Sequence, residues 1–418
     1  MGMTMAEKVL ARAAALSQVA PKQYITAKVD QVMVHDTFID CLTHMAKAGV
    51  EKLWNLDRVV GIIDHNIPAL TIDYAEAQAT IRTAVKRFGI KHWYDYKAGI
   101  CHQVMVEKGH IIPGELVLGC DSHSTTYGAL GAAGTGIGAA EMAYVLAKGT
   151  LWMKVPESIK FIMIGKLPIY VYPKDIILYI AQLYGTEVAQ YKSIEFCGPV
   201  AESMEISGRL TMSNMGVELG AKFAFFEADA KTLEYLKGRV HRSAKSFSPD
   251  EDARYQQVYE LDVSSLVPLV AVPHDVGNVH PVSDVKNVKV DQAFLGSCTN
   301  GRLEDLRIAA AVLKGRKIHR DTRMLVFPAS WEIYLAAIKD GTLETLINSQ
   351  AIICVPCCGS CSGIQMGLLG RGERCIATTN RNFRGRMGST EAEVYLASPA
   401  TVAASALNGY ITDPRTVL

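Results

Sequence analysis

The sequence lacks the features that mark a nucleic-acid-binding or membrane protein. Its 418 residues carry 43 lysines and arginines against 42 aspartates and glutamates, a net charge of +1, so no overall field favours nucleic acid or an anionic membrane. No apolar run is long enough to cross a bilayer, because even residues 159–183 are broken by Lys160, Pro173 and Asp175. We therefore expect neither nucleic acid nor a membrane as a partner.

The amino terminus lacks the long apolar core of a secretory signal. It predicts instead a capped amphipathic helix, because Thr4 can cap a helix and Glu7 follows three residues later. We therefore expect a cytoplasmic protein. In that compartment the 10 cysteines are expected to be thiols or metal ligands and not disulfides.

The chain is long enough for two to four domains, and 49% of its residues are hydrophobic. Strand-like and helix-like patterns alternate along most of it, which predicts an α/β fold. No internal repeat or low-complexity tract is present. Composition places boundaries near residue 155 and in the Pro- and Asp-containing stretch 268–285, so we predict domains over 1–155, 156–285 and 286–418.

Polar residues repeatedly follow short apolar runs. Four runs are predicted to be strands that end just before such residues: 59–63, 116–119, 292–295 and 352–355. Open α/β sheets build their ligand sites at the carboxyl ends of strands. These polar residues are therefore the candidates for a functional site.

Cysteines form the first candidate group. Cys354, Cys357, Cys358 and Cys361 lie within eight residues, and Cys298 stands in an unusual Gly-Ser-Cys-Thr-Asn segment about sixty residues upstream. Cysteine thiolates in glycine-containing loops are typical ligands of iron–sulfur clusters. The spacing alone leaves a redox pair or part of a zinc site open, although structural zinc usually takes two pairs separated by a longer loop.

Histidines beside aspartates form the second group. Asp64–His65, His102 and Asp121–His123 could each supply an oriented imidazole for proton transfer, with His35–Asp36 as a fourth case. Any one of these histidines could instead have a structural role. Their repetition in similar settings favours a general acid.

Arginines and glycines make up two further features. Residues 380–386 contain three arginines, Arg381, Arg384 and Arg386, which could bind carboxylates in a bidentate manner, or form a solvated or phosphate-binding loop. The glycine run 131–139 is similar to a dinucleotide-binding fingerprint, but the polar segment before it is no apolar strand. We expect the run to form a tight turn before a helix.

Together these motifs resemble the aconitase superfamily, and within it the members whose large subunit is a separate chain. Seven segments carry the resemblance in the family's order: 64–66, 100–103, 121–123, 214–218, 296–302, 358–361 and 380–386. The resemblance covers nearly the whole chain. It implies three α/β/α domains around a central cluster cleft, without the mobile swivel domain of the family.

The resemblance implies specific roles for these residues. A four-iron, four-sulfur cluster with one open iron would be held by Cys298, Cys358 and Cys361. Other residues would act on the leaving hydroxyl or place water and substrate: Asp64, His65, His102, Asp121, His123 and Glu218. A third set would contact the substrate: Ser122, Asn214, Arg381 and Arg386. Cys354 and Cys357 fall outside the matched ligand positions.

The implied activity is the removal and re-addition of water on a 2- or 3-substituted malate, with 3-isopropylmalate as the first candidate. Homoaconitate, methylmalate and 2,3-dimethylmalate are alternatives, and an iron-responsive RNA-binding protein is an alternative of another class. The family's catalytic serine is carried by the swivel domain, so the resemblance implies a small partner subunit in a heterodimer or heterotetramer. Residues 37–40 (Thr-Phe-Ile-Asp) depart from the small residues usual at this position in the family, where the segment lies close to the substrate, so we expect an altered substrate pocket.

Overall fold

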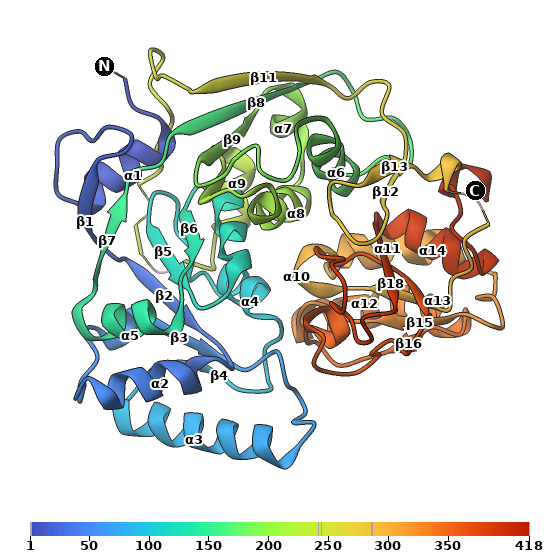
Figure 1. Ribbon diagram of the computed structural model, residues 1–418, viewed down its shortest axis with the longest axis horizontal. Helices are drawn as coiled ribbons and strands as arrows, with labels where there is room; N and C mark the ends of the chain where they lie inside the picture. Colours follow the sequence, from blue (N-terminus) through green and yellow to red (C-terminus); the bar gives the residue numbers. More distant parts are fainter. Residues whose placement is uncertain (1, 241, 244, 286, 418) are drawn as a thin grey trace.

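The computed structural model describes residues 2–240, 242–243, 245–285 and 287–417. Its strands form sheets of five, four and seven strands and one two-stranded ribbon. Figure 1 shows the five-stranded sheet at lower left, the four-stranded sheet across the top and the seven-stranded sheet at right. The predicted α/β class is confirmed.

The five-stranded sheet, here the first sheet, is parallel throughout and has the order β4-β3-β2-β5-β6. Its strands are β2 (Gln31–Val34), β3 (Val59–Ile62), β4 (His92–Tyr94), β5 (Leu116–Gly119) and β6 (Ala133–Gly136). Its helices are α2 (Phe38–Lys47), α3 (Ile72–Phe88), α4 (Cys101–Glu107) and α5 (Ala139–Lys148). The strands β2, β3 and β5 are buried at every position, as expected of a parallel sheet covered on both faces.

The amino-terminal helix α1 (Met5–Ala13) begins where the sequence predicts. The Thr4 side chain accepts from the Glu7 N–H and the Glu7 carboxylate accepts from the Thr4 N–H, a complete capping box. The helix lies beside the ribbon of β1 (Tyr24–Lys28) and β7 (Thr150–Lys154).

The second sheet is also parallel, with the order β10-β9-β8-β11. Its strands are β8 (Ser158–Ile164), β9 (Ser193–Cys197), β10 (Phe223–Phe226) and β11 (Gln257–Asp262). The helices of this part are α6 (Pro173–Tyr184), α7 (Pro199–Ser203), α8 (Ile206–Met215) and α9 (Ala230–Leu236). One apolar cluster runs through the first and second sheets and extends into the third, so the three parts share buried packing.

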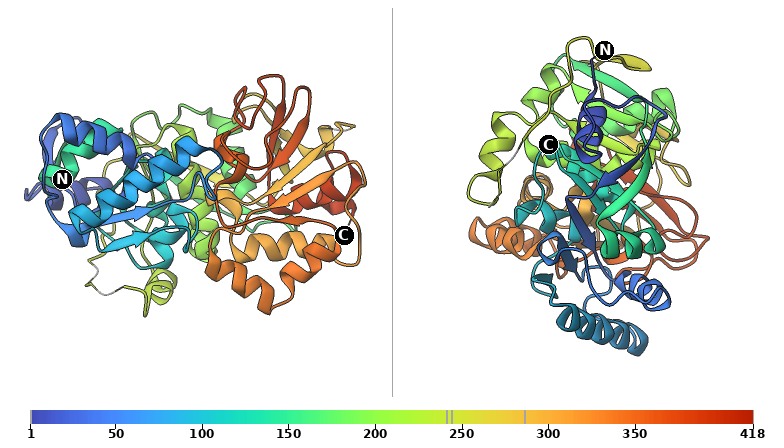
Figure 2. Two further views of the ribbon diagram at one scale, coloured as in Figure 1. Left: turned by 90° about the horizontal axis from the view of Figure 1, so that it is seen from below. Right: turned by 90° about the vertical axis from the view of Figure 1, so that its left-hand side faces the viewer.

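The third sheet has the order β13-β12-β18-β17-β14-β15-β16 and is parallel from β18 to β16. Its strands are β12 (Leu269–Ala271), β13 (Val279–Pro281), β14 (Gln292–Leu295), β15 (Arg323–Val326), β16 (Ile352–Ile353), β17 (Arg374–Ala377) and β18 (Glu393–Ala397). Its helices are α10 (Ser297–Asn300), α11 (Leu303–Leu313), α12 (Trp331–Lys339), α13 (Thr342–Asn348) and α14 (Pro399–Asn408). In the left view of Figure 2 this part, coloured orange to red, lies beside the rest of the chain.

The sheets give a first view of the predicted domain boundaries. The first two sheets separate between β7 and β8, at the predicted position near residue 155. The strands β12 and β13 precede the second predicted boundary at 285, yet they pair with the third sheet through antiparallel contacts of β12 with β18. The division into three domains remains a prediction.

Candidate active site

Three neighbouring strands of the first sheet deliver the acidic and histidine residues. The strand β2 leads into His35 and Asp36, β3 into the Asp64–His65 pair, and β5 into the segment that begins at Asp121. These strands are adjacent and parallel, so their carboxyl ends meet at one edge of the sheet. The polar residues that the sequence places after separate strands therefore come together in space.

The Asp36 carboxylate holds the loop that carries the Asp64–His65 pair. One of its oxygens accepts from the backbone N–H groups of Asp64 (3.0 Å) and His65 (2.9 Å). The other accepts from the Asn66 N–H at 3.2 Å. Three successive N–H groups on one carboxylate fix the backbone of this loop.

The His65 ring is oriented by Asp64. Its Nδ1 donates to Asp64 Oδ1 at 2.7 Å, while Asp64 Oδ2 accepts from the Cys101 N–H at 2.7 Å. Burial alone would lower the pKa of His65, but the surrounding carboxylates of Asp64, Asp121 and Asp36 raise it to about 10. His65 is therefore a protonated imidazolium at neutral pH and can donate a proton.

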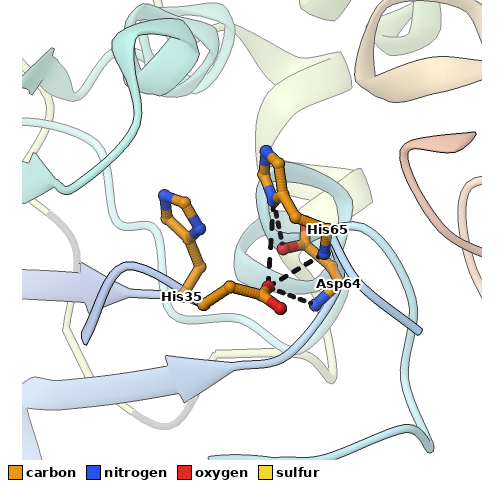
Figure 3. A group of neighbouring side chains, drawn as sticks. His35, Asp64 and His65 are labelled. Atoms are coloured by element: carbon orange, nitrogen blue, oxygen red, sulfur yellow. Dashed lines mark hydrogen bonds and ion pairs between the residues drawn. The ribbon is translucent and has the colours of Figure 1, made fainter. Parts of the chain in front are cut away.

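His35 lies against this pair, as Figure 3 shows. Its ring stacks on that of His65 with centroids 4.5 Å apart, and its Nε2 lies 3.3 Å from the Cys120 carbonyl oxygen. The four side chains of His35, Asp36, Asp64 and His65 are of the type that binds metal ions. Because both carboxylates already accept from N–H groups, we assign this group to holding the loop and not to a metal ion.

Asp121 organises two further histidines. Its Oδ1 accepts from His102 Nε2 at 2.8 Å and from the His123 backbone N–H at 2.8 Å. The other ring nitrogen of His102 lies 3.1 Å from the Tyr127 hydroxyl. Although burial opposes it, the hydrogen bonds and charges of His102 and His123 hold the pKa of Asp121 well below its usual range. The carboxylate therefore stays charged between the two rings.

Glu218 links His123 to the arginine loop. Its Oε1 accepts from His123 Nε2 at 2.9 Å and from Arg381 Nε at 2.7 Å. Burial would raise the pKa of Glu218, but these two partners lower it. Ser122 lies beside this group, with its hydroxyl 3.4 Å from His123 Nδ1.

The glycine run behind this loop differs from the predicted turn. Residues 133–136 form the strand β6, and α5 starts at Ala139. A Cβ on Gly134 would lie 2.2 Å from the Ser124 carbonyl oxygen, and one on Gly136 would lie 2.6 Å from that of Asp121. The expectation of a turn alone is therefore wrong: these glycines let β6 pass directly against the 121–124 segment.

The third sheet supplies the cysteines. After β14 the chain turns through Gly296 (φ +151°) and Ser297 (φ +73°), a conformation rare for a residue with a side chain, and places Cys298 at the cavity. Cys358 and Cys361 lie at a short 3₁₀ turn (Gly359–Ser362) that follows β16. All three cysteines are buried, with side-chain exposures of 5–7%.

One small cavity joins these groups. Its lining is formed by His65, Cys101, His102, Asp121, His123, Cys298, Cys358, Cys361, Ser362, Asn380 and Arg386. Asp64, Glu218 and Asn214 contact members of this lining from behind. Cys354 and Cys357 are not among the lining residues, in keeping with their place outside the matched motif.

The cysteine set fits an iron–sulfur cluster. Burial raises the pKa of Cys298 to about 12 and that of Cys358 well above its usual range, so metal ligation is the way these thiols become thiolates here. Polar hydrogens also face the sulfurs: Asn214 Nδ2 lies 3.2 Å and Asn380 Nδ2 3.5 Å from Cys298 Sγ. Donors of this kind favour negative charge on a cluster and its ligands.

Hydrogen bonds join the loop of the first sheet that carries Asp64 and His65 to the cysteine-containing segment of the third-sheet part. The Cys358 N–H donates to the Asp64 carbonyl oxygen at 3.2 Å, and Gln365 Nε2 donates to the His65 carbonyl oxygen at 2.5 Å. On the opposite side, Arg386 Nη2 lies 3.9 Å from Cys361 Sγ and carries the guanidinium into the cavity lining.

Several residues near the cavity were not predicted from the sequence. Cys101 and Asn380 line it, although the sequence motifs around them predict no role for either residue. Lys174 is fully buried, donates to the carbonyl oxygens of Thr378 (3.2 Å) and Thr379, and has its pKa lowered to about 7 by burial. A lysine at the start of an ordinary helix carries no signal of this role in the sequence.

The departure at residues 37–40 lies at the edge of the site. The Thr37 hydroxyl is 3.3 Å from His35 Nε2, and α2 begins at Phe38, whose side chain is fully buried in the core. None of residues 37–40 lines the catalytic cavity.

Comparison with known proteins agrees with the motif order. The model of the aconitase family (aconitate hydratase) matches residues 7–287 and 280–409 in two overlapping segments. The chain belongs to the aconitase family. This membership implies an iron–sulfur cluster, and it confirms the resemblance found in the sequence.

Curated relatives match this family member from end to end. It is 48% identical to the 3-isopropylmalate dehydratase large subunit 1 of Methanopyrus kandleri, over 100% of both chains. It is also 48% identical to the probable methanogen homoaconitase large subunit of Methanothermobacter thermautotrophicus, over 99% of this chain and 98% of that one. The 3-isopropylmalate dehydratase large subunit of Hydrogenobaculum sp. is 44% identical over 100% and 99%.

A solved structure supports the fold. The holo form of aconitase X from Thermococcus kodakaraensis aligns with a TM-score of 0.50 over 85% of this chain and 84% of that chain, at 12% identity. Within the described residues, no helix combines the length and the apolar character needed to span a membrane.

Proposed function

We propose that this chain is the large subunit of an iron–sulfur hydro-lyase that removes and re-adds water on a substituted malate, with 3-isopropylmalate as substrate. One observation carries the proposal: the Asp/His groups of the first sheet and the cysteines of the third line a single cavity. The full-length relatives named 3-isopropylmalate dehydratase large subunits support the choice of substrate. Homoaconitate is the second candidate, favoured by the equally similar homoaconitase relative.

We infer that Cys298, Cys358 and Cys361 would hold a four-iron, four-sulfur cluster. When bound, the cluster supplies a Lewis-acidic iron site for the hydroxyl and one carboxylate of the substrate. Cys101 also lines the cavity, but it lies outside the three matched ligand positions of the family motif. We therefore leave Cys101 out of the ligand set, so that one iron stays open.

The chain's own residues support proton transfer to the leaving hydroxyl. His65 is held protonated by the neighbouring carboxylates, and its ring faces the cavity. His102 and His123 are each fixed by a hydrogen bond to a carboxylate, which sets the direction of their second ring nitrogen. We assign the acid role to His65, with Asp121, His102 and His123 positioning the hydroxyl.

The substrate's carboxylates need cationic partners. Arg386 lines the cavity, and Arg381 is held beside it by Glu218. Planar guanidinium groups can bind a carboxylate through two parallel hydrogen bonds. We assign both arginines, with Ser122 and Asn214, to binding the substrate.

The base that removes the carbon-bound proton is the remaining requirement. We propose that a serine of a small partner subunit supplies it, in a heterodimer or heterotetramer. The large-subunit names of the relatives support a second chain.

An anaerobic assay tests this function. The chain is purified without oxygen together with the proposed small subunit, and iron, labile sulfide and visible absorbance are measured. The complex is then assayed with 3-isopropylmalate, homoaconitate, 2-methylmalate and 2,3-dimethylmalate. We expect the highest kcat/KM for 3-isopropylmalate. A folded complex without iron would refute the cluster, and a preference for another acid would refute the substrate alone.

A further inference from the structure

A fully buried lysine beside the cysteines has no carboxylate partner. Lys174, in the first turn of α6, has an exposed fraction of 0%. Its amino group donates to the carbonyl oxygens of Thr378 (3.2 Å) and Thr379 and, within the part of the chain that the structure describes, forms no ion pair with a carboxylate. Lysines are rarely buried to this extent without an anion nearby, because moving a charge out of water is costly. Lys174 therefore needs a source of negative charge in its surroundings.

The adjacent carboxyl group of Asp175 does not meet this need. Its two oxygens accept from the backbone N–H groups of Leu269 (2.9 Å) and Tyr172 (2.8 Å). Burial raises the pKa of Asp175 to about 7, so a large part of this group is protonated at neutral pH. A carboxyl group that is only partly ionised and already holds two other donors is a weak counter-charge for the lysine.

The backbone that accepts from this lysine also supports the cysteines. The Thr378 hydroxyl accepts from the Gly296 N–H at 2.9 Å and donates to the Gly296 carbonyl oxygen at 3.0 Å, just before Cys298 in the chain. Shortly after Thr378, the Asn380 side chain lies 3.5 Å from Cys298 Sγ through Nδ2 and 3.8 Å from Cys361 Sγ through Oδ1. A short stretch of chain thus separates the lysine amino group from two of the proposed cluster ligands.

The cysteine sulfurs are also the groups that act most strongly on the lysine after burial itself. Burial lowers the pKa of Lys174 to about 7, and the sulfurs of Cys361 and Cys298 lead the groups that raise it again. They do so as thiolates, which is the form that binds iron. An oxidised four-iron, four-sulfur cluster on three thiolates carries a net negative charge, so a bound cluster supplies the anion that the buried amino group lacks.

A second cation, Arg386, approaches the same sulfurs from the cavity. Its Nη2 lies 3.9 Å from Cys361 Sγ, but the guanidinium lines the cavity and is assigned to the substrate. Lys174 is not among the lining residues and belongs to α6, which packs against α8 and the strands β12 and β13 (Figure 1). Its charge therefore acts at the same place whether or not substrate is bound.

We propose that Lys174 is a positioning residue that supplies a buried counter-charge to the cluster. Its fixed ammonium group stabilises thiolate ligation at Cys298 and Cys361. It also raises the reduction potential of the cluster, because an added electron is more favourable beside a positive charge. The lysine touches neither the substrate nor the reacting atoms. This inference rests on one part of the proposed function, the ligation of the cluster by the three cysteines.

The midpoint potential of the cluster tests the proposal. Iron and labile sulfide of the anaerobic complex are measured first, and the potential is then determined by a redox titration monitored by electron paramagnetic resonance. Lys174→Met and Lys174→Gln remove the charge, and each should make reduction about tenfold less favourable, a midpoint potential about 59 mV lower. Lys174→Arg keeps the charge, so its reduction equilibrium should stay within about twofold of that of the parent.

Lys222→Met is the matched control. Lys222 is also partly buried, and burial lowers its pKa, but the charge that acts on it is that of Glu141 and not that of a cysteine. The midpoint potential of this variant should equal that of the parent. A parent-like potential in a neutral Lys174 variant would overturn the proposal. An equal fall in Lys222→Met, or a potential in Lys174→Arg as low as in Lys174→Gln, would overturn it as well.

Melting temperatures of the cluster-free proteins decide the case in which the neutral variants do not retain the cluster. If such a variant melts as the cluster-free parent does, the lysine is needed only when the cluster is bound, which supports the proposal. If it melts well below the cluster-free parent, Lys174 has a packing role and the proposal fails. An iron-free parent complex would refute the proposed function and this inference together, whereas an iron-containing parent with unaltered potentials in the variants refutes the role of the lysine alone.

Discussion

The half of the catalytic cavity built by the first sheet differs from the half built by the third sheet in how its polar atoms are satisfied. On the first sheet, the carboxylates of Asp36, Asp64 and Asp121 accept from backbone N–H groups and from histidines at 2.7–3.2 Å. On the third sheet, Cys298 and Cys361 meet amide or guanidinium groups only at 3.2–3.9 Å.

The comparison shows in which half of the cavity the protein satisfies its own polar groups without a bound cofactor. Carboxylates and imidazoles can satisfy one another, so the acid half is preorganised by the fold. Buried thiols have weak hydrogen-bonding capacity and raised pKa values, as for Cys298 and Cys358. The cysteine half therefore depends on a bound group for its final form.

The largest effect should come from the cysteine half. Cys358→Ser should abolish cluster retention and hydro-lyase activity together, because it removes one of three proposed thiolate ligands. Iron, sulfide and visible absorbance of the anaerobic protein measure the loss. The near-isosteric Cys101→Ser in the same cavity is the control and should keep the cluster. Loss of the cluster in Cys101→Ser, or its retention in Cys358→Ser, would contradict the proposed set of cluster ligands.

A second prediction concerns Arg386, whose guanidinium group lies in the cavity lining. Arg386→Lys should lower kcat/KM about tenfold to a hundredfold, because a lysine cannot replace bidentate binding of a carboxylate. The cluster absorbance should be unchanged. Arg384→Lys, on an exposed residue of the same loop, is the matched control. Near-normal kinetics of Arg386→Lys would remove that side chain from the substrate site.

A third prediction tests whether the hydrogen bonds of Asp36 are needed to position His65 in the half of the cavity that the first sheet builds. Asp36→Asn should lower kcat about tenfold, because an amide cannot accept from all three N–H groups that Asp36 now holds. Asp36 also helps to raise the pKa of His65, so the alkaline limb of the pH–rate profile should move to lower pH. Asp40→Asn, on the exposed side of α2, should leave the profile unchanged. A profile of unaltered shape in Asp36→Asn would argue against His65 as the acid.

The smallest effect concerns stability of the first-sheet part away from the cavity. Burial lowers the pKa of His110 to about 4 from 6.5, with Tyr94 hydrogen-bonded to it at 2.8 Å. The unfolded chain takes up this proton below pH 6.5 and the folded chain does not, so stability present above pH 6.5 is lost as the pH falls toward 4. The loss should reach about 2 kcal/mol at pH 5.

Melting temperatures at pH 7.5 and pH 5 measure this loss. His110→Asn should lose less stability on acidification than the parent, whereas His44→Asn, on an exposed helix position, should lose as much. If the first-sheet part is stable independently of the cluster, the difference in acid-induced loss of melting temperature between the parent and His110→Asn should be the same before and after the cluster is removed.

Much of the site could be predicted because its residues are close together along the chain. The Asp64–His65 pair, the 121–123 segment and the Cys358–Cys361 pair are each a short motif after a strand. The part that could not be predicted depends on contacts between elements far apart in sequence. The three N–H groups on Asp36 come from another strand's loop, and Lys174 reaches a segment about two hundred residues away.

The strand within the glycine run and the pairing of β12 with β18 do not follow from the sequence, for a related reason. Gly134 and Gly136 lie in a strand because the 121–124 segment packs directly on them, and a single sequence does not reveal such packing. The strands β12 and β13 join the third sheet through β18, more than a hundred residues later.

The buried lysine of α6 has a consequence for how molecules reach the catalytic cavity. Lys174 joins the second part of the chain to the third through the carbonyl oxygens of Thr378 and Thr379, directly beside the cysteines. Moving these two parts apart would separate the Lys174 amino group from its two acceptors while it is still buried, and an unpaired buried polar group is costly. We infer that these two parts stay closed during turnover, so that acid enters and product leaves without their separation.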